Sequence, residues 1–314
     1  MTSVMASVTT QPTTNVMIVG SGAIGLLWYS HFCLCNNKAV NCFLYQSPTR
    51  KTLQHSILFA SLSNQKTTFP SKVITSSNEH SIDIILVCVK SYQLNQAIAD
   101  IAPFITLNTL VITTHNGLGA LNTESTQLLQ NNNVFDLLTT HGCLKLSENK
   151  IVHTGAGVSH LGRKFGKKSP LLETKTTQLL HSVLPEVIWC EDILSKQWLK
   201  LAINCVINPL TALHNIKNGA LIHEKFENTI NQLIDEIVVI AHLKNISLNK
   251  ESLKETVYLV AQNTAKNSSS MRCDVLQGRQ TEVEYINGYI HRLGQELNIP
   301  TPKNTELYQR VLAL

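Results

Sequence analysis

Hydrophobic residues recur along this chain in two patterns that change near residue 190. Before that point, short apolar runs alternate with amphipathic or loop segments, which is typical of buried strands separated by helices. From Asp192 onward, apolar positions follow the 3.6-residue period of helices, as in 226–243 and 281–297. The chain therefore predicts a parallel sheet covered by helices, followed by a helical region. The strand-like runs are 16–19, 39–45, 82–89, 109–113 and 186–190, and 152–153 with 157–161 predict an antiparallel extension.

A glycine-rich turn follows the first strand-like run and opens an amphipathic stretch. This strand–turn–helix context is the one that a G-x-G-x-x-G dinucleotide fingerprint requires. The first glycine permits a tight turn, the second lets a pyrophosphate approach the backbone, and the third lets helix and strand pack closely. The helix N-terminus adds N–H donors and partial positive charge. The alternative is a glycine-rich turn in another kind of α/β domain. The motif reads Gly20, Ser21, Gly22, Ala23, Ile24 and Gly25.

Taken together, these patterns predict an α/β protein of two domains. We expect residues 1–190 to form a Rossmann-type dinucleotide-binding domain, in which 1–14 is a loose extension. Residues 191–314 are expected to form an all-helical domain for substrate binding and catalysis. The first fourteen residues lack the basic start and continuous apolar stretch of a secretory signal.

The segment about twenty residues beyond the glycine motif bears on the choice of dinucleotide. An NAD site places an Asp or Glu there to bind the ribose diol, but 43–51 contains no carboxylate. Arg50 and Lys51 lie in that segment, and no acidic residue precedes Glu79. A 2′-phosphate would be attracted to such a region, so NADPH is favoured over NADH. The alternative is that Arg50 and Lys51 are ordinary solvated loop charges.

Composition excludes several other classes of function. A net charge of +5 over 314 residues, with no lysine-rich tail, does not suggest nucleic acid or a membrane surface as partner. No apolar run has the length of a membrane span. Eight scattered cysteines without paired C-x-x-C units predict reduced thiols, a cytoplasmic location and no metal site.

One almost wholly apolar segment, 198–211, carries polar side chains four, four and three residues apart. On a helix this spacing places them along a single face. Such a stripe needs partners or a wet cleft, because an unpaired polar group in an apolar core costs about 1–3 kcal/mol. The alternative is an internal salt bridge of the lysine, with asparagines that cap neighbouring elements. The stripe consists of Lys200, Asn204, Asn208 and Thr211.

Pro209 lies within the same segment. A proline has no N–H and its ring clashes with the preceding turn, so it should interrupt the helical hydrogen bonds. We expect a bend there that leaves backbone groups exposed at a cleft.

Several motifs, in this order and spacing, resemble the ketopantoate reductase (2-dehydropantoate 2-reductase) family. The resemblance extends from about Asn15 to Tyr308, nearly the whole chain. A lone glycine motif would be weak evidence, whereas the joint order of all six is specific. The motifs are Gly20 to Gly25, Val87-Cys-Val-Lys90, His115-Asn-Gly-Leu-Gly119, Thr140-His-Gly142, Trp198 through Leu213, and Ser269-Ser270-Met271 leading to Arg279-Gln-Thr-Glu282 and Gly288.

The resemblance implies a role for each matching residue. Lys200 matches the family's proton donor, and a lysine ammonium can stabilise charge on the carbonyl oxygen as hydride reaches the carbon. Glu282 matches an acidic residue that accepts a hydrogen bond from the substrate hydroxyl and borders the cofactor. The family's substrate-binding positions match Asn204, Asn208, Ser270 and Asn116, and Lys90 and Asn116 match residues on the nicotinamide side.

Plain structural interpretations stand beside these roles. Glu282 and Glu284 lie on an apparent helix, where an exposed glutamate is usually a solvated charge. Ser270 could be a plain helix N-cap. The chain also departs from the family at one point, because Gln46 and Ser47 stand where members commonly carry an arginine for the 2′-phosphate.

The resemblance implies NADPH-dependent reduction of 2-dehydropantoate to pantoate, a step toward pantothenate and coenzyme A. It places the keto acid at the interface of the two domains of a monomer or homodimer. Two alternatives remain: a reductase for another branched 2-keto acid, and a catalytically inactive protein that senses NADP. A sensor has no need of a proton donor, so Lys200 together with Glu282 speaks against the second.

Overall fold

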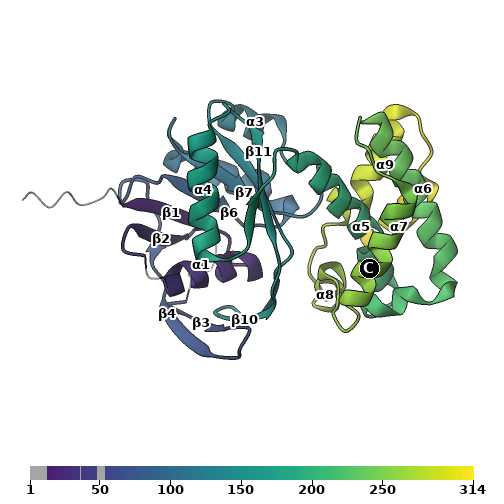
Figure 1. The fold of residues 1–314 in the computed structure, drawn as a ribbon, viewed down its shortest axis with the longest axis horizontal. Coiled ribbons are helices and arrows are strands. Elements are labelled where there is room, and N and C mark those ends of the chain that lie inside the picture. The colour runs from purple at the N-terminus through teal and green to yellow at the C-terminus, as the bar shows by residue number, and fades with distance from the viewer. Residues whose placement is uncertain (1–12, 36, 48–53) are drawn as a thin grey trace, which may run out of the picture. The chain divides into compact units, whose positions relative to one another are not determined.

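A computed structural model describes residues 13–35, 37–47 and 54–314, and the chain divides into two compact units (Figure 1). Unit 1 comprises the described residues up to Val89 together with 96–114 and 127–191. Unit 2 comprises 192–314 and two short segments from earlier in the chain, Lys90–Asn95 and His115–Thr126. These two segments carry motifs singled out above, so Lys90 and Asn116 belong to the helical unit.

A mostly parallel eight-stranded sheet forms the centre of unit 1 and confirms the predicted α/β class. The predicted runs 16–19, 82–89 and 109–113 give neighbouring strands at its centre, whereas the run 186–190 gives an edge strand and the central strand over 134–139 was not predicted. In sheet order the strands are β12 (Val187–Trp189), β11 (Ser159–Phe165), β8 (Val134–Thr139), β7 (Leu110–Thr113), β6 (Ile84–Val87), β1 (Thr14–Val19), β2 (Val40–Tyr45) and β5 (Val73–Ile74).

The strand order reverses beside β1. Strand β1 pairs in parallel with β2 on one side and with β6 on the other. Strands β6, β7 and β8 continue in parallel, and β11 then pairs antiparallel with β8, as predicted for 157–161, whereas 152–153 lie in a strand of a separate sheet. In doubly wound sheets, ligands bind at the carboxyl ends of strands where the order reverses. The glycine turn follows β1 at this point.

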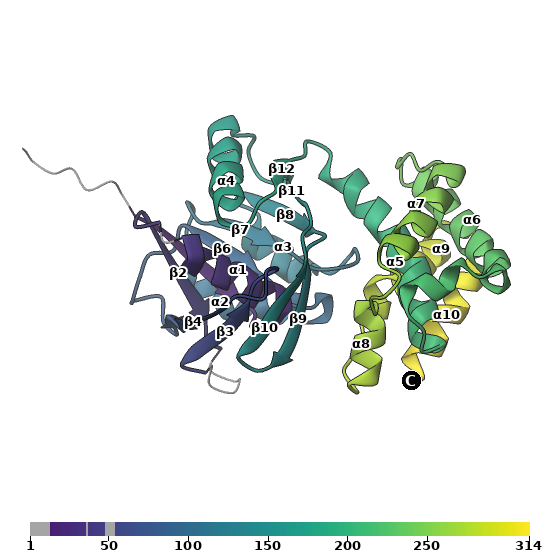
Figure 2. The ribbon, with the colours of Figure 1, turned by 60° about the horizontal axis from the view of Figure 1, so that its bottom comes forward.

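A second sheet of four strands in unit 1 was not predicted. Its strands are grouped in Figure 2, and residues far apart in sequence meet in it, since Leu58 pairs with Lys150. Residues 66–70 include a lysine and two threonines, and every second side chain is exposed, so no apolar run marks them. The order is β4 (Lys66–Pro70), β3 (Ser56–Ala60), β10 (Lys150–Gly155) and β9 (Gly142–Ser147).

Helices cover the large sheet of unit 1. Val16 and Ile18 of β1 share one apolar core with Leu26 and Leu180 from the first and fourth helices, which contact each other. The intervening Met17 is fully buried yet lies outside that core, because side chains alternate across a strand. The helical segments are α1 (Ala23–Cys35), η2 (Ala102–Phe104) and α4 (Pro170–Val183), together with α2 (Leu94–Ile101) and α3 (Thr123–Leu129), whose first residues belong to unit 2.

Unit 2 is helical, as predicted, and its apolar core surrounds one long helix, α5 (Ile193–Leu213). No helix in the part of the chain that the structure describes is long and apolar enough to cross a membrane. The other segments are η1 (Ser91–Gln93), η3 (Asn218–Ile222), η4 (Glu224–Phe226), α6 (Glu227–Leu243), α7 (Lys250–Asn263), α8 (Ser270–Leu276), η5 (Val283–Tyr285), α9 (Asn287–Leu297) and α10 (Pro302–Leu312).

The predicted helix over 281–297 is wrong in its first part. Glu282 precedes the short 3₁₀ turn η5, and α9 begins only at Asn287. Ile286 has φ −110° and ψ −96°, which lies outside the helical region. The backbone N–H of Leu118 donates to the carbonyl of Tyr285 at 3.0 Å, so a segment from elsewhere in the chain competes for a bond that a helix would use.

Helix α5 runs through Pro209 without ending there. Pro209 cannot donate to the carbonyl of Cys205 four residues earlier, as expected. That carbonyl accepts a hydrogen bond from Asn287 Nδ2 at 2.9 Å, and Cys205 and Asn287 are both fully buried. The prediction of exposed backbone groups at this point is therefore wrong, because a buried amide fills the missing position.

Three histidines in unit 1 connect α1 with the smaller sheet. His31 Nε2 lies 3.4 Å from His153 Nδ1, and His153 Nε2 lies 3.2 Å from His141 Nδ1. Burial and the neighbouring rings lower the pKa of His31 to about 4, and burial likewise lowers the pKa of His141 and His153. All three are therefore neutral at pH 7.

The histidine cluster predicts a loss of stability in mild acid. A histidine whose folded pKa lies below 6.5 contributes stability above pH 6.5, and this stability is lost as pH falls from 6.5 toward 4. We expect the free energy of unfolding of unit 1 to drop by about 1–2 kcal/mol between pH 7 and pH 5. His31→Asn should flatten this dependence in urea titrations, whereas the exposed His55→Asn should leave it unchanged. An equal slope in all three proteins would contradict the assignment.

Candidate active site

The glycine turn of unit 1 has the backbone geometry that a fingerprint motif needs. Gly20 has φ +108°, a conformation that favours glycine, and a Cβ there would lie 2.3 Å from the carbonyl oxygen of Cys88. A Cβ on Gly25 would lie 1.9 Å from the carbonyl oxygen of Gly20. Both glycines are therefore required by the protein's own packing.

Gly22 differs from these two glycines. It is exposed, and a Cβ there would meet only one protein atom, the Cys88 carbonyl oxygen at 4.0 Å. The space over Gly22 is therefore open to a ligand. Helix α1 starts at Ala23, and the first turn of a helix presents N–H groups without intrahelical partners. Ser21, Ala23 and Ile24 complete the turn, so these residues fit the pyrophosphate of a dinucleotide.

The residues expected to select the 2′-phosphate are only partly described. Arg50 and Lys51 lie outside the described residues. Ser47 is buried just after β2, and its Oγ donates to Asp100 Oδ2 at 3.2 Å, while Gln46 Nε2 donates to the carbonyl of Ser47. Ser47 is therefore engaged in the packing of unit 1.

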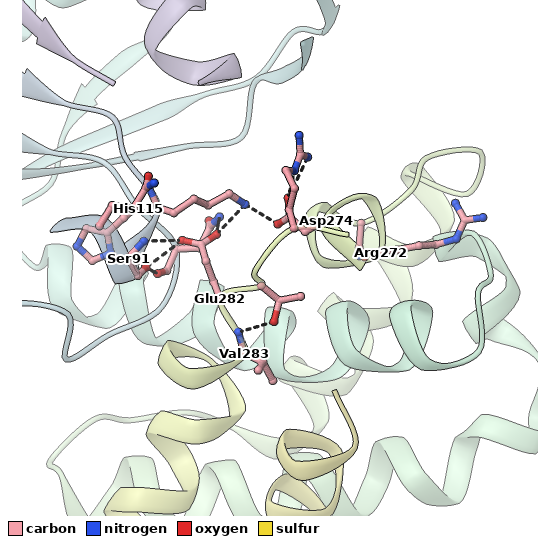
Figure 3. A network of polar contacts seen from close by, with 12 residues as sticks. Ser91, His115, Arg272, Asp274, Glu282 and Val283 are labelled. Atoms are coloured by element: carbon pink, nitrogen blue, oxygen red, sulfur yellow. Dashed lines mark hydrogen bonds and ion pairs between the residues drawn. The ribbon is translucent and has the colours of Figure 1, made fainter. Parts of the chain in front are cut away.

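In unit 2, the carboxylate of Glu282 is buried, with 3% of the residue exposed, and is surrounded by donors from two distant segments (Figure 3). Its Oε1 accepts from the N–H of Ser91 at 3.0 Å and from Ser91 Oγ at 2.9 Å. Its Oε2 accepts from Asn116 Nδ2 at 3.1 Å and from Lys90 Nζ at 3.3 Å. The interpretation of Glu282 as an exposed, solvated charge is therefore wrong.

Lys90 also contacts a second buried carboxylate, that of Asp274, with Nζ–Oδ2 at 2.7 Å (Figure 3). Asp274 Oδ1 in turn accepts from Arg279, whose Nε lies at 3.1 Å and whose terminal nitrogen lies at 2.9 Å. Two cations and two carboxylates thus form one ion network. Asp274 and Ser91 were not singled out from the sequence, and Arg279 was named only as part of a motif, without a role. Asp274 stands four residues after Ser270 on α8, a helical spacing that could have indicated it.

The network sets the charge of its members. Burial opposes the charged form of Lys90, yet the carboxylates of Glu282 and Asp274 outweigh it and raise the pKa of Lys90. Burial likewise opposes ionisation of Glu282, but Lys90, Asn116 and Ser91 lower its pKa below the usual value. Both groups are charged at neutral pH.

Helix α5 places Lys200, Asn204 and Asn208 along one face, as the spacing predicted. Burial lowers the pKa of Lys200, and the negative charge of Glu282 acts in the opposite direction. The structure thus brings Lys200 under the electrostatic influence of the Glu282 network. Asn208 is buried with 5% exposed, and Asn204 is half-buried.

The last member of the stripe joins α5 to the start of α8. Thr211 Oγ1 lies 2.7 Å from Ser269 Oγ, and Ser269 caps α8 by accepting from the N–H of Arg272 at 3.1 Å. Ser270 is therefore not the N-cap: it is the first residue of α8 and is exposed. Among the residues described, no group of three or more His, Cys, Asp or Glu is arranged to hold a metal ion.

Family models and known proteins match nearly the whole of this chain. Residues 16–164 match the family model described as ketopantoate reductase PanE/ApbA, and residues 192–314 match its C-terminal counterpart. A 2-dehydropantoate 2-reductase of Vibrio cholerae is 34% identical over 96% of this chain and 97% of its own length.

Solved structures share the fold at lower identity. A D-mandelate dehydrogenase, solved with NADH and anilino(oxo)acetate, superposes with a TM-score of 0.85 at 19% identity, covering 96% of this chain and 97% of that one. A dimeric ketopantoate reductase from Staphylococcus aureus superposes with a TM-score of 0.78 at 20% identity, covering 95% and 98%.

The glycine turn predicts different outcomes for two matched substitutions. Gly25→Ala places a methyl group against backbone and should destabilise unit 1 by about 3 kcal/mol or more. Gly22→Ala should change stability by less than about 1 kcal/mol, because its Cβ meets no close protein atom, yet weaken binding of a reduced nicotinamide dinucleotide about 10-fold or more. Thermal unfolding and fluorescence titration with NADPH separate the two effects. Unchanged NADPH affinity in Gly22→Ala would count against a pyrophosphate at this turn.

Proposed function

Because this chain belongs to the ketopantoate reductase family, an oxidoreductase family, we propose that it reduces 2-dehydropantoate to pantoate with NADPH. The observation that carries this proposal is a buried, ionised Glu282 in the same compact unit as Lys200, where its charge acts on the pKa of the lysine. A lysine whose pKa is lowered yet partly sustained by a carboxylate is suited to deliver a proton near neutral pH.

The glycine turn of unit 1 is proposed to hold the dinucleotide. The open space over Gly22 and the N–H groups at the start of α1 would receive the pyrophosphate. When bound, the dinucleotide supplies the hydride for carbonyl reduction. Preference for NADPH over NADH is proposed because 43–51 carries no carboxylate to bind a ribose diol and contains Arg50 and Lys51.

Lys200 is proposed to be the proton donor. As the carbonyl carbon is reduced, negative charge develops on its oxygen, and the ammonium of Lys200 can stabilise that charge and transfer a proton to it. Burial makes the ammonium less stable than in water and so a stronger acid, while Glu282 keeps it protonated over a wider pH range.

Glu282 is proposed to accept a hydrogen bond from the substrate hydroxyl. Its two oxygens lie within hydrogen-bond distance of four donors, of which the Ser91 hydroxyl also contacts the carbonyl oxygen of Asn116. Lys90 is the most distant of these, at 3.3 Å, and has a second partner in Asp274 at 2.7 Å. Lys90 can therefore yield its place on Glu282 to the hydroxyl while staying paired with Asp274.

The substrate carboxylate and hydroxyl are proposed to contact Asn204, Asn208 and Ser270, with Asn116 and Lys90 toward the nicotinamide. Neutral amides and a hydroxyl suit a small polar acid, because they donate hydrogen bonds without a buried charge. A reductase of another branched 2-keto acid would use the same groups. As for assembly, we propose a monomer or homodimer, and a dimeric relative supports the latter.

Lys200→Ala should abolish most turnover while leaving the cofactor in place. Mixing the protein with ketopantoate and NADPH should give loss of the reduced nicotinamide absorbance, slower with NADH. Lys200→Ala should lower kcat by about 10²- to 10⁴-fold, with NADPH affinity unchanged because the glycine turn is intact. Binding of NADPH without turnover by the unaltered protein would favour another keto acid, and then the sensor alternative.

Glu282→Gln should alter the pH dependence of the residual reaction. Loss of the negative charge disfavours the protonated form of Lys200, so its pKa falls further and the alkaline decline of kcat/KM should move to lower pH. Glu284→Gln is the matched control, because Glu284 pairs with Arg292 and Tyr308. An alkaline limb that stays in place in Glu282→Gln would show that Lys200 is not the group that titrates.

A further inference from the structure

The backbone of α5 has a gap in its hydrogen bonds within the polar stripe. Pro209 has no N–H, so the carbonyl of Cys205 lacks its donor from four residues later. Cys205 follows Asn204 directly and lies between Lys200 and Asn208 along the helix. A helix interrupted by proline can bend at such a point. The conformation here therefore sets the position of Lys200 relative to Asn208.

A side chain from another helix fills this gap. Asn287, the first residue of α9, donates its Nδ2 to the Cys205 carbonyl at 2.9 Å and to Asn304 Oδ1 at 3.0 Å. Asn287 and Asn304 are both fully buried. The Oδ1 of Asn287 is buried and has no hydrogen-bond partner among the described residues. Asn287 thus leaves its own oxygen unpaired while its Nδ2 donates to two acceptors. The position therefore requires the two N–H groups of the amide.

A carboxylate fixes the orientation of the second amide. Asn304 Nδ2 donates to Glu236 Oε2 at 2.8 Å, so Asn304 Oδ1 must face Asn287. Glu236 also accepts from the backbone N–H groups of Lys303 at 2.7 Å and Asn304 at 2.9 Å, in the first turn of α10. The relay from Glu236 through Asn304 thus leaves Asn287 only one orientation, with both N–H bonds directed at acceptors.

We propose that Asn287 is a positioning residue for the reaction. It replaces the hydrogen bond that Pro209 removes and so holds Lys200, Asn204 and Asn208 in the geometry that the keto acid requires. This rests on the proposed function for its substrate, but the contact with Cys205 is independent of that function. Asn287 acts through the backbone of α5 and needs no contact with substrate or cofactor.

The test is a double-mutant cycle between Asn287 and Pro209. The substitution Pro209→Ala restores an N–H for the Cys205 carbonyl, which makes the amide of Asn287 dispensable. Asn287→Ala alone should lower kcat/KM for ketopantoate by about 10- to 100-fold, since small displacements of reacting groups have effects of this size. NADPH affinity should stay within about two-fold, because the glycine turn is untouched. In the Pro209→Ala background the loss should shrink to about three-fold or less.

Asn132→Ala is the matched control for a merely structural role. Asn132 is buried in unit 1 and donates both Nδ2 bonds to carbonyls, those of Thr106 and Thr109. It should lower thermal stability without the loss in kcat/KM and without rescue by Pro209→Ala. Asn287→Leu, which retains bulk, is used if the alanine variant folds poorly. An equal loss of kcat/KM in both Pro209 backgrounds, or the same loss in Asn132→Ala, would overturn the proposal.

Amide hydrogen exchange across α5 separates this proposal from the proposed function. Exchange at 206–212 should accelerate in Asn287→Ala and return toward the original rate when Pro209→Ala is added. This readout needs no substrate. If the unaltered protein failed to reduce ketopantoate, the proposed function would fail, while exchange would still decide whether Asn287 holds α5. Unchanged exchange in Asn287→Ala would overturn the positioning role.

Discussion

The buried carboxylate of Glu282 is the constraint on which the rest of unit 2 depends. A charge removed from water is tolerated only when donors replace its hydration. Three donors reach it from Lys90 and Ser91, and a fourth comes from Asn116, on two segments that precede the helical region in the sequence. Together with the bond from Leu118 to Tyr285, these bonds join residues 90–95 and 115–126 to the helical unit. The same bonds keep Glu282 ionised, which in turn sustains the ammonium of Lys200.

A second buried polar system acts on the position of the same lysine. In the Glu236–Asn304–Asn287 relay, Glu236 orients the amide of Asn304, Asn304 orients that of Asn287, and Asn287 donates to a backbone carbonyl of α5. Glu282 governs the charge on Lys200, whereas Asn287 governs where the helix bearing Lys200 lies. In both systems the carboxylate receives several donors, which offset the burial of Glu282 and the partial burial of Glu236. Protonation and placement of the proposed proton donor are thus controlled by separate groups of residues.

Features that depend on local spacing could be predicted from the sequence. The turn from Gly20 to Gly25 and the stripe on α5 are of this kind, because both follow from neighbouring residues and a regular period. Features that depend on distant pairing could not. Ser91 and Glu282 lie 191 residues apart, and nothing in either segment marks the bond. The helix expected over 281–286 failed because Leu118 donates to Tyr285 from outside. Pro209 was predicted to interrupt the helical hydrogen bonds, but the residue that replaces the missing bond to Cys205 is Asn287, which lies 82 residues away in the sequence.

The two units offer binding groups of different physical kinds, and this bears on how substrate choice can change. Unit 1 presents backbone N–H groups and an open space at Gly22, which do not depend on the side chains that contact a substrate. Unit 2 presents side chains, and these divide by burial. Glu282 and Asn208 are buried and constrained by their surroundings, so a change at either disturbs neighbours. Asn204 is half-buried and Ser270 is exposed. Substitution at these last two positions can alter the proposed contacts with a keto acid while leaving the charge and position of Lys200 as they are. Within the proposed mechanism, substrate specificity can therefore change without loss of the residues that control the proposed proton donor.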